Sequence, residues 1–262
     1  MRRKESEEES YQQYGKFEKP RTEFEKRKIA EGVFDKATLT SLFKLFNKYN
    51  LEITSMISQG KEANVYYGTI DDKNKETGKT KSREVAVKIF SVDAADFRTM
   101  KKYIRGDPRF HFCKDRRSLI YNWTQKEFKN LNKMHETVTC PEPIAFHNNI
   151  LIMEFIGRNG APAPRLKDLP PENPKEFFDK IMDCIGKIYR SGLVHGDLSE
   201  YNVLNNVEPV IIDVSQSVLL SHPMSQELLE RDVHNILKYF NNFGIKMDSA
   251  EAINFIKSKP DK

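Results

Sequence analysis

Residues 192–204 read GLVHGDLSEYNVL, and this stretch places polar side chains between two apolar ends. The polar residues include His195, Asp197, Ser199 and Asn202, and the ends are formed by Leu193, Val194, Val203 and Leu204. Polar groups held between buried-looking anchors are more informative than exposed ones. A carboxylate and a carboxamide five positions apart, anchored on both sides, indicate a site and not a solvated turn.

Two charged residues lie elsewhere at positions where apolar residues are expected. In the predicted strand over residues 84–90, the segment 85–90 (VAVKIF) is apolar on both faces, as buried strands are, except at Lys88. In the predicted helix over residues 118–136, Glu127 falls inside the apolar stripe of Ile120 and Leu131. Since a lone buried charge is costly, we expect Lys88 and Glu127 to pair. The alternative is a lysine that reaches water from a sheet edge and a glutamate at a helix rim.

The order of these features along the chain indicates a reaction. A glycine-bearing turn, SQGKEANVY (residues 58–66), precedes Lys88 and Glu127; Asp197, Asn202 and finally Asp213 follow. Phosphoryl transfer from Mg-ATP uses this order in protein kinases. A turn with few side chains lets backbone N–H groups approach phosphate, and carboxylate and amide oxygens suit Mg²⁺. A further aspartate orients the attacking hydroxyl and accepts its proton.

Several short motifs carry a family resemblance. HGDLSEYN fits the kinase pattern H-x-D-L-x-x-x-N with glycine in place of the usual arginine, VAVK fits the lysine strand, and IDVSQ stands where an ordinary kinase has D-F-G. SQGKEANV aligns with the glycine-rich loop only if Ser58 and Ala63 replace two glycines. Together with KEFKNL and HPMSQELLERDV, these motifs resemble the RIO family of atypical serine/threonine protein kinases, in particular its first (Rio-one) subgroup in the short archaeal form. The resemblance covers roughly residues 41–244.

The resemblance implies a role for each matching residue. Asp197 is the expected catalytic aspartate, and Asn202 is an expected metal ligand. Asp213 is expected to be a second metal ligand, and it matches the residue that is linked to a phospho-aspartate intermediate in RIO proteins. Lys88 and Glu127 match the family's ion pair. Further expected nucleotide contacts come from the glycine turn, the adenine-reading hinge and the 195–202 loop, and they are Ser58, Gly60, Lys61, Glu62, Ala63, Val65, Met153, Glu154, Ile156, Ser199 and Glu200. The implied cofactors are ATP and Mg²⁺, with Mn²⁺ as an alternative ion.

The predicted fold class is α+β, a bilobal protein-kinase-like fold whose N-lobe has an antiparallel sheet and one main helix. We expect a disordered charged tail over residues 1–31, a helical segment over 32–50 with its helix at 37–48, and an N-lobe with hinge over 51–157. A flexible basic loop is expected at about 98–118, and a trimmed, mainly helical C-lobe over 158–262. Only 49 residues follow Asp213, so a full activation segment and peptide groove are not expected.

Three other polar or aromatic residues are interpreted as structural. His195 braces the 195–202 loop in preference to transferring protons, and Asp232 in LERDV caps backbone amides of that loop. Trp123 is expected in the core. Ser199 and Glu200 line the loop. They either contact phosphate or metal, or they are solvent-exposed residues without a specific role.

Charge and cysteine content bear on partners and location. Residues 98–117 carry eight basic and two acidic side chains, although the whole chain is only +5. This segment is either a solvated loop or a patch for phosphate-rich partners, and the resemblance favours a pre-small-subunit ribosomal particle and its rRNA, with no DNA. Three cysteines without zinc spacing, and no apolar run of about 18 residues, predict a cytoplasmic protein without a membrane span.

The function that these features favour is ATP- and Mg-dependent phosphoryl transfer by a RIO-type serine/threonine kinase, an ATPase, or both. The resemblance adds small-ribosomal-subunit maturation and autophosphorylation, with Ser118 as a candidate acceptor. One alternative is a small-molecule phosphotransferase of the aminoglycoside-kinase type, although the C-terminal region is short for its acceptor domain. Another is a nucleotide-gated RNA or pre-ribosome assembly factor with little turnover. The rate of turnover separates this assembly factor from an enzyme.

Overall fold

The computed structural model describes residues 34–73, 80–92, 97–111, 113 and 115–258. The expected tail over residues 1–31 lies outside these residues. Contacts divide the chain into two compact units. The first comprises the chain up to Phe97 together with Cys113–Phe128 and Pro143–Pro162, and the second comprises Arg98–Phe112, Lys129–Glu142 and Ala163–Lys262.

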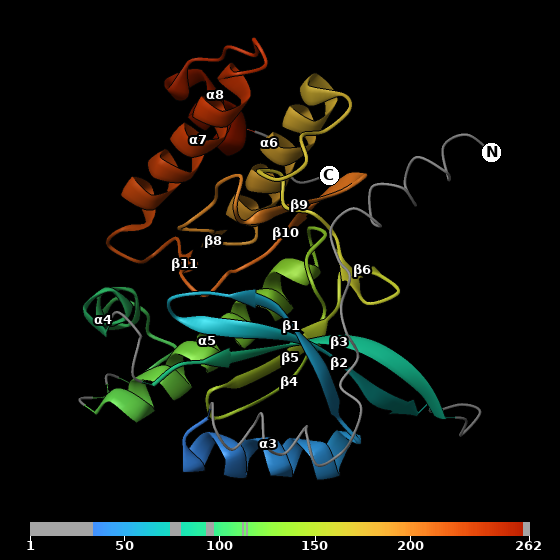
Figure 1. Cartoon of the computed structure of the whole chain (residues 1–262). Helices are drawn as coiled ribbons and strands as arrows, with labels where there is room; N and C mark the ends of the chain where they lie inside the picture. The colour runs from blue at the N-terminus through green and yellow to red at the C-terminus, as the bar shows by residue number, and fades with distance from the viewer. Residues whose placement is uncertain (1–33, 74–79, 93–96, 112, 114, 259–262) are drawn as a thin grey trace, which may run out of the picture. The chain divides into compact units, whose positions relative to one another are not determined.

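The first unit is built on a five-stranded sheet in which every neighbouring pair is antiparallel (Figure 1). The strand order is β1-β2-β3-β5-β4. The strands are β1 (Glu52–Gln59), β2 (Ala63–Lys73), β3 (Thr80–Phe90), β4 (Pro143–His147) and β5 (Ile150–Glu154), with a small hairpin of β6 (Gly157–Arg158) and β7 (Ala161–Pro162) after them. The predicted antiparallel sheet is confirmed.

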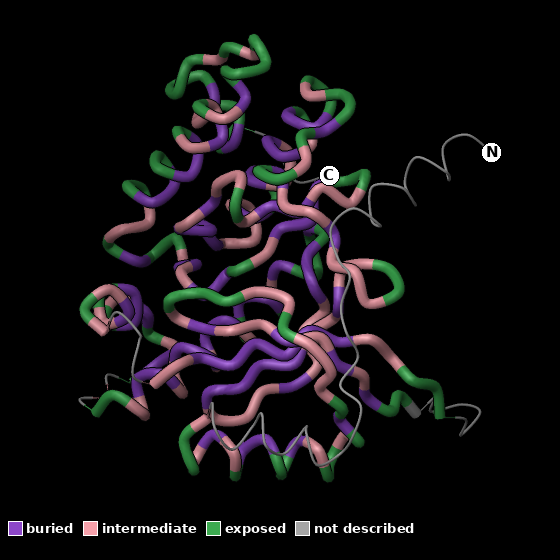
Figure 2. Tube along the Cα trace, in the orientation of Figure 1, coloured by how far each residue is buried: buried purple, intermediate pink, exposed green. Residues whose placement is uncertain are grey.

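Helix α3 (Lys36–Tyr49) packs on one face of this sheet. Asp35 begins the helix, because its side chain accepts hydrogen bonds from the first backbone N–H groups. Leu42 and Leu45 share a buried cluster with the odd-numbered residues Val85 and Val87 of β3. Since side chains alternate along a strand, the even-numbered residues of β3 face the opposite side. Both faces of β3 are buried over residues 85–90, as predicted from its apolar run (Figure 2).

Helix α5 (Arg116–His135) is the long helix predicted over residues 118–136. Its residues up to Phe128 belong to the first unit and those from Lys129 onward to the second. Trp123 is fully buried, as expected.

The second unit is mainly helical, as predicted. Its other helices are α4 (Phe97–Arg105, of which Phe97 belongs to the first unit), α6 (Pro174–Arg190), α7 (Ser225–Asn241) and α8 (Ser249–Ser258). Two short antiparallel pairs complete it, β8 (Leu193–Val194) with β11 (Val218–Leu219), and β9 (Val203–Asn206) with β10 (Glu208–Ile211). Asn173 caps α6, because its side chain accepts a hydrogen bond from the Glu176 N–H. No helix in the described part of the chain combines the length and apolar content needed to cross a membrane.

The structure differs from the sequence prediction at the basic segment. Where a flexible loop was expected over residues 98–118, the chain forms α4 and then the first turn of α5. Met100, Tyr103 and Ile104 of α4 are buried, and their spacing of three and four residues is that of one helix face. The sequence analysis did not recognise this apolar face, because basic residues lie among its three apolar positions.

Two boundaries also differ. Strand β3 begins at Thr80, four residues before the strand predicted over residues 84–90, and β2 stays paired with it as far as Lys73. The division between units falls after Pro162 and not after Gly157, and residues 98–112 and 129–142 group with the second unit. The sheet strands extend further because alternate exposed polar side chains are compatible with a two-stranded antiparallel ladder.

Candidate active site

One face of the first unit's sheet gathers several of the predicted nucleotide-binding residues. Val65 of β2 lies directly opposite Lys88 of β3, and Met153 of β5 lies opposite Ala86. Residues opposite one another on antiparallel strands share a face, and Ala86 and Lys88 are two positions apart. Val65, Lys88 and Met153 therefore lie on the face of the sheet that α3 does not cover.

The expected pair of Lys88 and Glu127 forms on this face. The Lys88 Nζ donates a hydrogen bond of 2.9 Å to Glu127 Oε1, and the two side chains are 8% and 1% exposed. The ammonium also lies 5.1 Å from the centroid of the Phe90 ring. An ion pair so far removed from water holds the lysine in one place, because moving either charge would leave the other unpaired.

The predicted glycine turn is the tight connection between β1 and β2. Ser58, near the end of β1, lies opposite Val65 of β2. The loop residues Gly60, Lys61 and Glu62 follow, and β2 begins at Ala63. The Gly60 N–H donates to the Ala63 carbonyl at 3.0 Å, and a Cβ on Gly60 would lie 2.9 Å from that oxygen. The close turn thus requires glycine at this position. Phosphate binding by these residues stays a prediction.

The predicted hinge lies where β5 ends. Met153 and Glu154 are its last two residues, and Ile156 belongs to no strand. All three side chains are partly buried. Their backbone reading of adenine stays a prediction.

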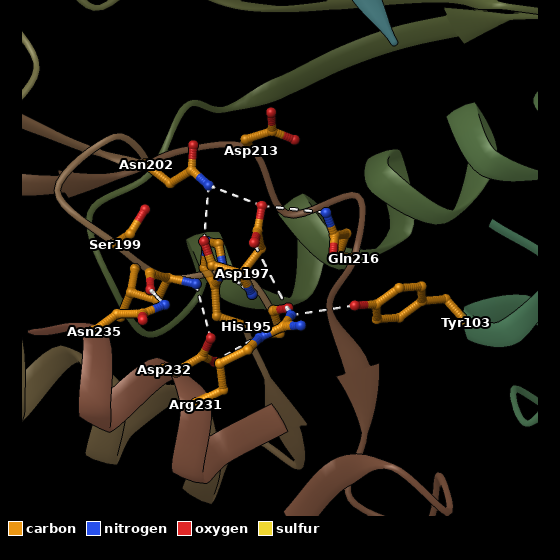
Figure 3. Close-up of polar contacts among 12 residues, drawn as sticks. Tyr103, His195, Asp197, Ser199, Asn202, Asp213, Gln216, Arg231, Asp232 and Asn235 are labelled. Carbon is orange, nitrogen blue, oxygen red and sulfur yellow. Dashed lines mark hydrogen bonds and ion pairs between the residues drawn. The ribbon is translucent and has the colours of Figure 1, made fainter. Parts of the chain in front are cut away.

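The 195–202 loop of the second unit joins β8 to β9 and carries Asp197 (Figure 3). The Asn202 Nδ2 donates to the Asp197 carbonyl at 2.8 Å and to its Oδ2 at 3.3 Å. Gln216 Nε2 donates to the same Oδ2 at 3.2 Å. The Arg231 Nη2 lies 4.0 Å from Oδ1. One carboxylate oxygen is therefore held by two amides, while the other faces a guanidinium without a hydrogen bond to it.

Helix α7 holds the backbone on both sides of Asp197. Asp232 is 1% exposed, and its two oxygens accept from the N–H groups of Gly196 at 2.7 Å and Leu198 at 2.8 Å. Asn235 Nδ2 donates to the Leu198 carbonyl at 3.1 Å, and Arg231 donates to the Gly196 carbonyl. Burial raises the pKa of Asp232 to about 7, against the lowering effect of the two backbone donors. Asp232 thus caps the loop amides, as expected.

Glycine replaces the usual arginine of the motif at position 196 for a steric reason. Gly196 has φ +82°, and a Cβ there would lie 2.8 Å from the Gln216 carbonyl oxygen. Only glycine adopts this conformation without strain while another backbone approaches so closely. The 195–202 loop and the residues after Asp213 therefore pack directly against each other.

His195 braces this loop, as the sequence interpretation had it. It is 3% exposed, its Nε2 lies 3.1 Å from the Ile212 carbonyl, and its Nδ1 accepts from the Asp197 N–H at 3.3 Å. These contacts require a proton on Nε2 and none on Nδ1, which is the neutral ring. Burial lowers the pKa of His195 to about 4, although the Ile212 carbonyl and Asp213 act in the opposite direction.

Asp213 follows β10 and begins the 213–217 loop. Its φ of 57° is in the left-handed region, which costs a non-glycine residue roughly 1 kcal/mol. Ser215 Oγ donates to its Oδ1 at 3.0 Å. The buried Asn130 of α5 donates to the carbonyls of Val214 at 2.9 Å and Ser217 at 3.0 Å. These bonds keep the loop in the strained conformation and the carboxylate exposed.

The two aspartates influence each other electrostatically. Burial raises the pKa of Asp197, and the negative charge of Asp213 raises it further, while Arg231 and the Asn202 hydrogen bond lower it. A carboxylate poised in this way is a better proton acceptor than an ordinary surface aspartate.

The residues beside Asp197 fit a hard divalent cation. Because Asn202 Nδ2 donates to Asp197, its amide oxygen points away, toward the side on which Asp213 lies (Figure 3). An amide oxygen and a carboxylate are donors that suit Mg²⁺, which completes its shell with phosphate and water. Ser199 Oγ accepts from the Tyr201 N–H at 3.4 Å, and the Glu200 carbonyl accepts from Lys167. The roles of Ser199 and Glu200 toward nucleotide or metal stay predictions.

Five residues of this network were missed by the sequence reasoning: Gln216, Arg231, Asn235, Asn130 and Tyr103. The sequence carried a signal for Asn130, because this amide lies one turn after Glu127, where the helical pattern predicts an apolar residue. The structure shows that its side chain is fully buried. Gln216, Arg231 and Asn235 lie close in the chain to Asp213 and Asp232, but nothing in their spacing indicates a partner.

Comparison with known proteins was consistent over most of the chain. A family model described as the RIO domain matches residues 64–253. The Rio1 kinase of Methanocaldococcus jannaschii is 41% identical over 92% of this chain and 81% of its own length. The Rio1 kinase of Haloferax volcanii is 36% identical over 87% of this chain and 77% of its own length. Both are named RIO-type serine/threonine-protein kinase.

The chain belongs to the RIO family. The Rio1 subgroup expected from the motifs is confirmed, and with it the kinase class of enzyme. Among solved structures, the Rio2 kinase of Chaetomium thermophilum matches with a TM-score of 0.62 and 22% identity over 86% of this chain and 69% of that one. A second structure of that protein, an ADP/Mg²⁺-phosphoaspartate complex, matches with a TM-score of 0.60 over 83% and 65%. These likenesses confirm the protein-kinase-like fold.

Replacing Lys88 tests the buried ion pair. Lys88→Ala should lower the free energy of unfolding by about 3–5 kcal/mol, because the Glu127 carboxylate would remain buried beside an empty space. Adding Glu127→Gln should recover part of the loss, since no ionised group then lacks its cation. Urea denaturation measures both.

The matched control for that test is Lys187→Ala, which removes the exposed pair with Asp183 on α6. It should cost no more than about 0.5 kcal/mol. A loss this small for Lys88→Ala would show that the Lys88–Glu127 pair is accessible to water.

His195 makes stability depend on pH. Its folded pKa of about 4 lies below the unfolded value of 6.5, so the unfolded chain binds the extra proton first and stability falls as pH falls below 6.5. From pH 7 to pH 5 this single group should remove about 2 kcal/mol. Denaturation curves at both pH values should give a smaller difference for His195→Asn than for the parent chain. Equal differences would mean that His195 is protonated, or solvated, in the folded state.

Proposed function

We propose that this chain transfers the γ-phosphoryl group of Mg-ATP, with Asp197 as the catalytic aspartate. The observation that carries the proposal is the arrangement around Asp197. Its carboxylate is held by Asn202 and Gln216, its backbone is fixed by α7, and the exposed Asp213 carboxylate raises its pKa. Such an arrangement suits a group that orients a hydroxyl and takes its proton.

The first unit is proposed to bind the nucleotide. Lys88, held by Glu127, presents a fixed positive charge to the α- and β-phosphates. The backbone of the Gly60 turn approaches phosphate oxygens, and Ser58 adds a hydroxyl. Backbone groups of Glu154 and Ile156 read adenine, and the side chains of Val65 and Met153, on the Lys88 face, pack against the base.

In the second unit, Asn202 and Asp213 are proposed to hold Mg²⁺. The ion, when bound, neutralises negative charge on the phosphates during transfer. The chain's own residues do the rest: Asp197 Oδ1 accepts the proton of the attacking hydroxyl while Oδ2 stays bound to the two amides. Asn130 keeps Asp213 in place by holding the carbonyls of its loop. Mn²⁺ is proposed as a substitute, since it accepts the same oxygen donors.

Asp213 is proposed to have a second role as nucleophile. Its carboxylate oxygen would bond to the γ-phosphorus as the bond to the bridging oxygen of ADP breaks. Water would then attack the phosphorus, releasing phosphate and restoring the carboxylate. The ADP/Mg²⁺-phosphoaspartate complex of the Chaetomium thermophilum protein supports this step by likeness. Net ATP hydrolysis would result, alongside transfer to serine or threonine, as the names of the archaeal relatives suggest.

The decisive experiment incubates the protein with γ-labelled ATP and Mg²⁺ and separates three products. Free phosphate reports hydrolysis, acid-stable label on Ser or Thr reports autophosphorylation, and acid-labile label that hydroxylamine releases reports an acyl phosphate. Asp197→Asn should slow single-turnover transfer about 10²–10⁴-fold while ATP still binds. Ser118, in the first turn of α5 with its N–H bonded to Asp115, is the proposed acceptor, and Ser118→Ala should remove acid-stable label there.

The control is Asp179→Asn, an exposed carboxylate on α6 that should leave all three products unchanged. Transfer by Asp197→Asn at the parent rate would remove Asp197 from the proposed role. Hydroxylamine-labile label that persists in Asp213→Asn would remove the phospho-aspartate.

The outer face of α4 favours a phosphate-rich partner as a second element of function. Arg98, Lys102 and Arg105 are exposed on it, while Met100, Tyr103 and Ile104 face inward. We propose that this face binds ribosomal RNA of a small-subunit precursor and that turnover acts in maturation of that particle. Cys113, Cys140 and Cys184 form no disulfide in the described part of the chain, which suits the reducing cytoplasm where this would occur.

Charge reversal tests the RNA proposal. Lys102→Glu with Arg105→Glu should weaken binding of a small-subunit rRNA fragment and flatten its salt dependence by about one unit of slope per lost phosphate contact. Lys175→Glu with Lys187→Glu on α6 is the matched control. Equal affinity and slope for both variants and the parent would leave the α4 face a merely solvated surface.

A further inference from the structure

Helix α4 contacts the side chain that faces the proposed catalytic aspartate. The Tyr103 hydroxyl accepts a hydrogen bond of 3.2 Å from the Arg231 Nη2, and the same nitrogen donates to the Gly196 carbonyl (Figure 3). Asp197 Oδ1 is 4.0 Å from it. One nitrogen of Arg231 thus connects α4 to the backbone of Gly196 and lies near the side chain of the next residue, Asp197.

The contact is built from a rigid base. Tyr103 is 2% exposed and lies in the apolar stripe of α4, between two other buried residues. A Cβ on Gly106, just after the helix, would overlap His222 and lie 2.8 Å from Pro223 Cδ, so the end of α4 packs tightly on the chain before α7. A hydroxyl fixed in this way can select one position of a flexible partner.

A second connection runs from the same segment to the 213–217 loop. Asp107, 3% exposed, accepts from Arg109 Nε at 2.9 Å and Nη2 at 2.6 Å. Arg109 Nη2 also donates to Asn130 Oδ1 at 2.9 Å, and Asn130 holds the Val214 and Ser217 carbonyls. Hydrogen bonds therefore connect the segment that carries α4 to both the 195–202 loop and the 213–217 loop.

Arg231 needs such a partner to stay in place. Its side chain is 44% exposed and Asp197 is 45% exposed, so their attraction at 4.0 Å is screened by water and weak. A long side chain held by such an attraction alone would sample several rotamers. The Tyr103 hydroxyl and the Gly196 carbonyl supply the directional contacts that choose one.

We propose that Tyr103 and Arg231 form a positioning pair, through which docking of α4 sets the orientation of the Asp197 carboxylate. With Oδ2 held by Asn202 and Gln216, Oδ1 is the oxygen that accepts the proton of the attacking hydroxyl. Arg231 orients Oδ1 without occupying it, since 4.0 Å is too long for a hydrogen bond. The pair then affects the rate of transfer and not the binding of nucleotide; this inference rests on the role proposed above for Asp197.

The kinetic test uses Tyr103→Phe, which removes only the hydroxyl, together with Arg231→Met and Arg231→Lys. Tyr103→Phe should slow single-turnover consumption of γ-labelled ATP about two- to tenfold, with the Kd for ATP unchanged. Arg231→Met should slow it about tenfold or more, and Arg231→Lys should recover part of the rate. Combining Tyr103→Phe with Arg231→Met should add nothing, because the hydroxyl has then lost its partner.

The matched control is Tyr239→Phe, which removes a hydroxyl bonded to the Leu166 carbonyl at 2.8 Å from α7 itself. It should leave the rate as in the parent chain. Equal rates for Tyr103→Phe and Tyr239→Phe, independent and additive effects of the two pair variants, or a Kd that rises in step with the lost rate would each overturn the inference.

A readout without turnover separates this inference from the function it rests on. Hydrogen exchange of the peptide over residues 193–204 should be faster in Tyr103→Phe and Arg231→Met than in Tyr239→Phe or the parent. A parent that consumes no ATP, with exchange changed as expected, would contradict the proposed function and leave the pair in place. Unchanged exchange in both variants would contradict the pair whatever the turnover.

Discussion

The second unit depends on one constraint, the hold of α7 on the backbone groups of the two residues that flank Asp197. Arg231 donates to the Gly196 carbonyl and Asn235 to the Leu198 carbonyl, while Asp232 accepts from both N–H groups. A buried peptide group without a partner costs about as much as a lost hydrogen bond, so four satisfied groups leave the loop a single conformation. The direction of the Asp197 side chain follows from that conformation.

The other contacts of the site refine what α7 has set. Two neutral amides, from Asn202 and Gln216, hold one carboxylate oxygen without cancelling its charge. Burial raises the pKa of Asp197, and a second carboxylate, at Asp213, raises it further. Asn202 and Arg231, which contact the Asp197 carboxylate, act in the opposite direction and lower its pKa. The Asp213 backbone has a left-handed conformation, and the buried Asn130 amide of α5 holds the carbonyls of Val214 and Ser217 in the same loop.

The first unit applies the same principle to a cation. Lys88 lies on a strand that is buried on both faces, and Glu127 holds its ammonium with almost no access to water. This charge is fixed before any ligand arrives, so little reorganisation remains for a nucleotide to cause. Local sequence was sufficient to predict this pair, because each charge interrupts an apolar pattern of known period. Helix α4 was missed for the converse reason, since its charges outnumber the apolar residues between them.

The sequence by itself determined several of the elements and the identity of the chemical groups. The predicted elements include α3, α5 and β3, and the spacing of Asp197 and Asn202 within one loop marked the site. Only the tertiary structure decided which side chains reach that loop from elsewhere. Tyr103 and Arg231 meet across more than a hundred residues, and the Gln216 amide reaches Asp197 because Gly196 lets two backbones approach. Hydrogen bonds are short and directional, so their partners depend on how helices pack and not on any period in the chain.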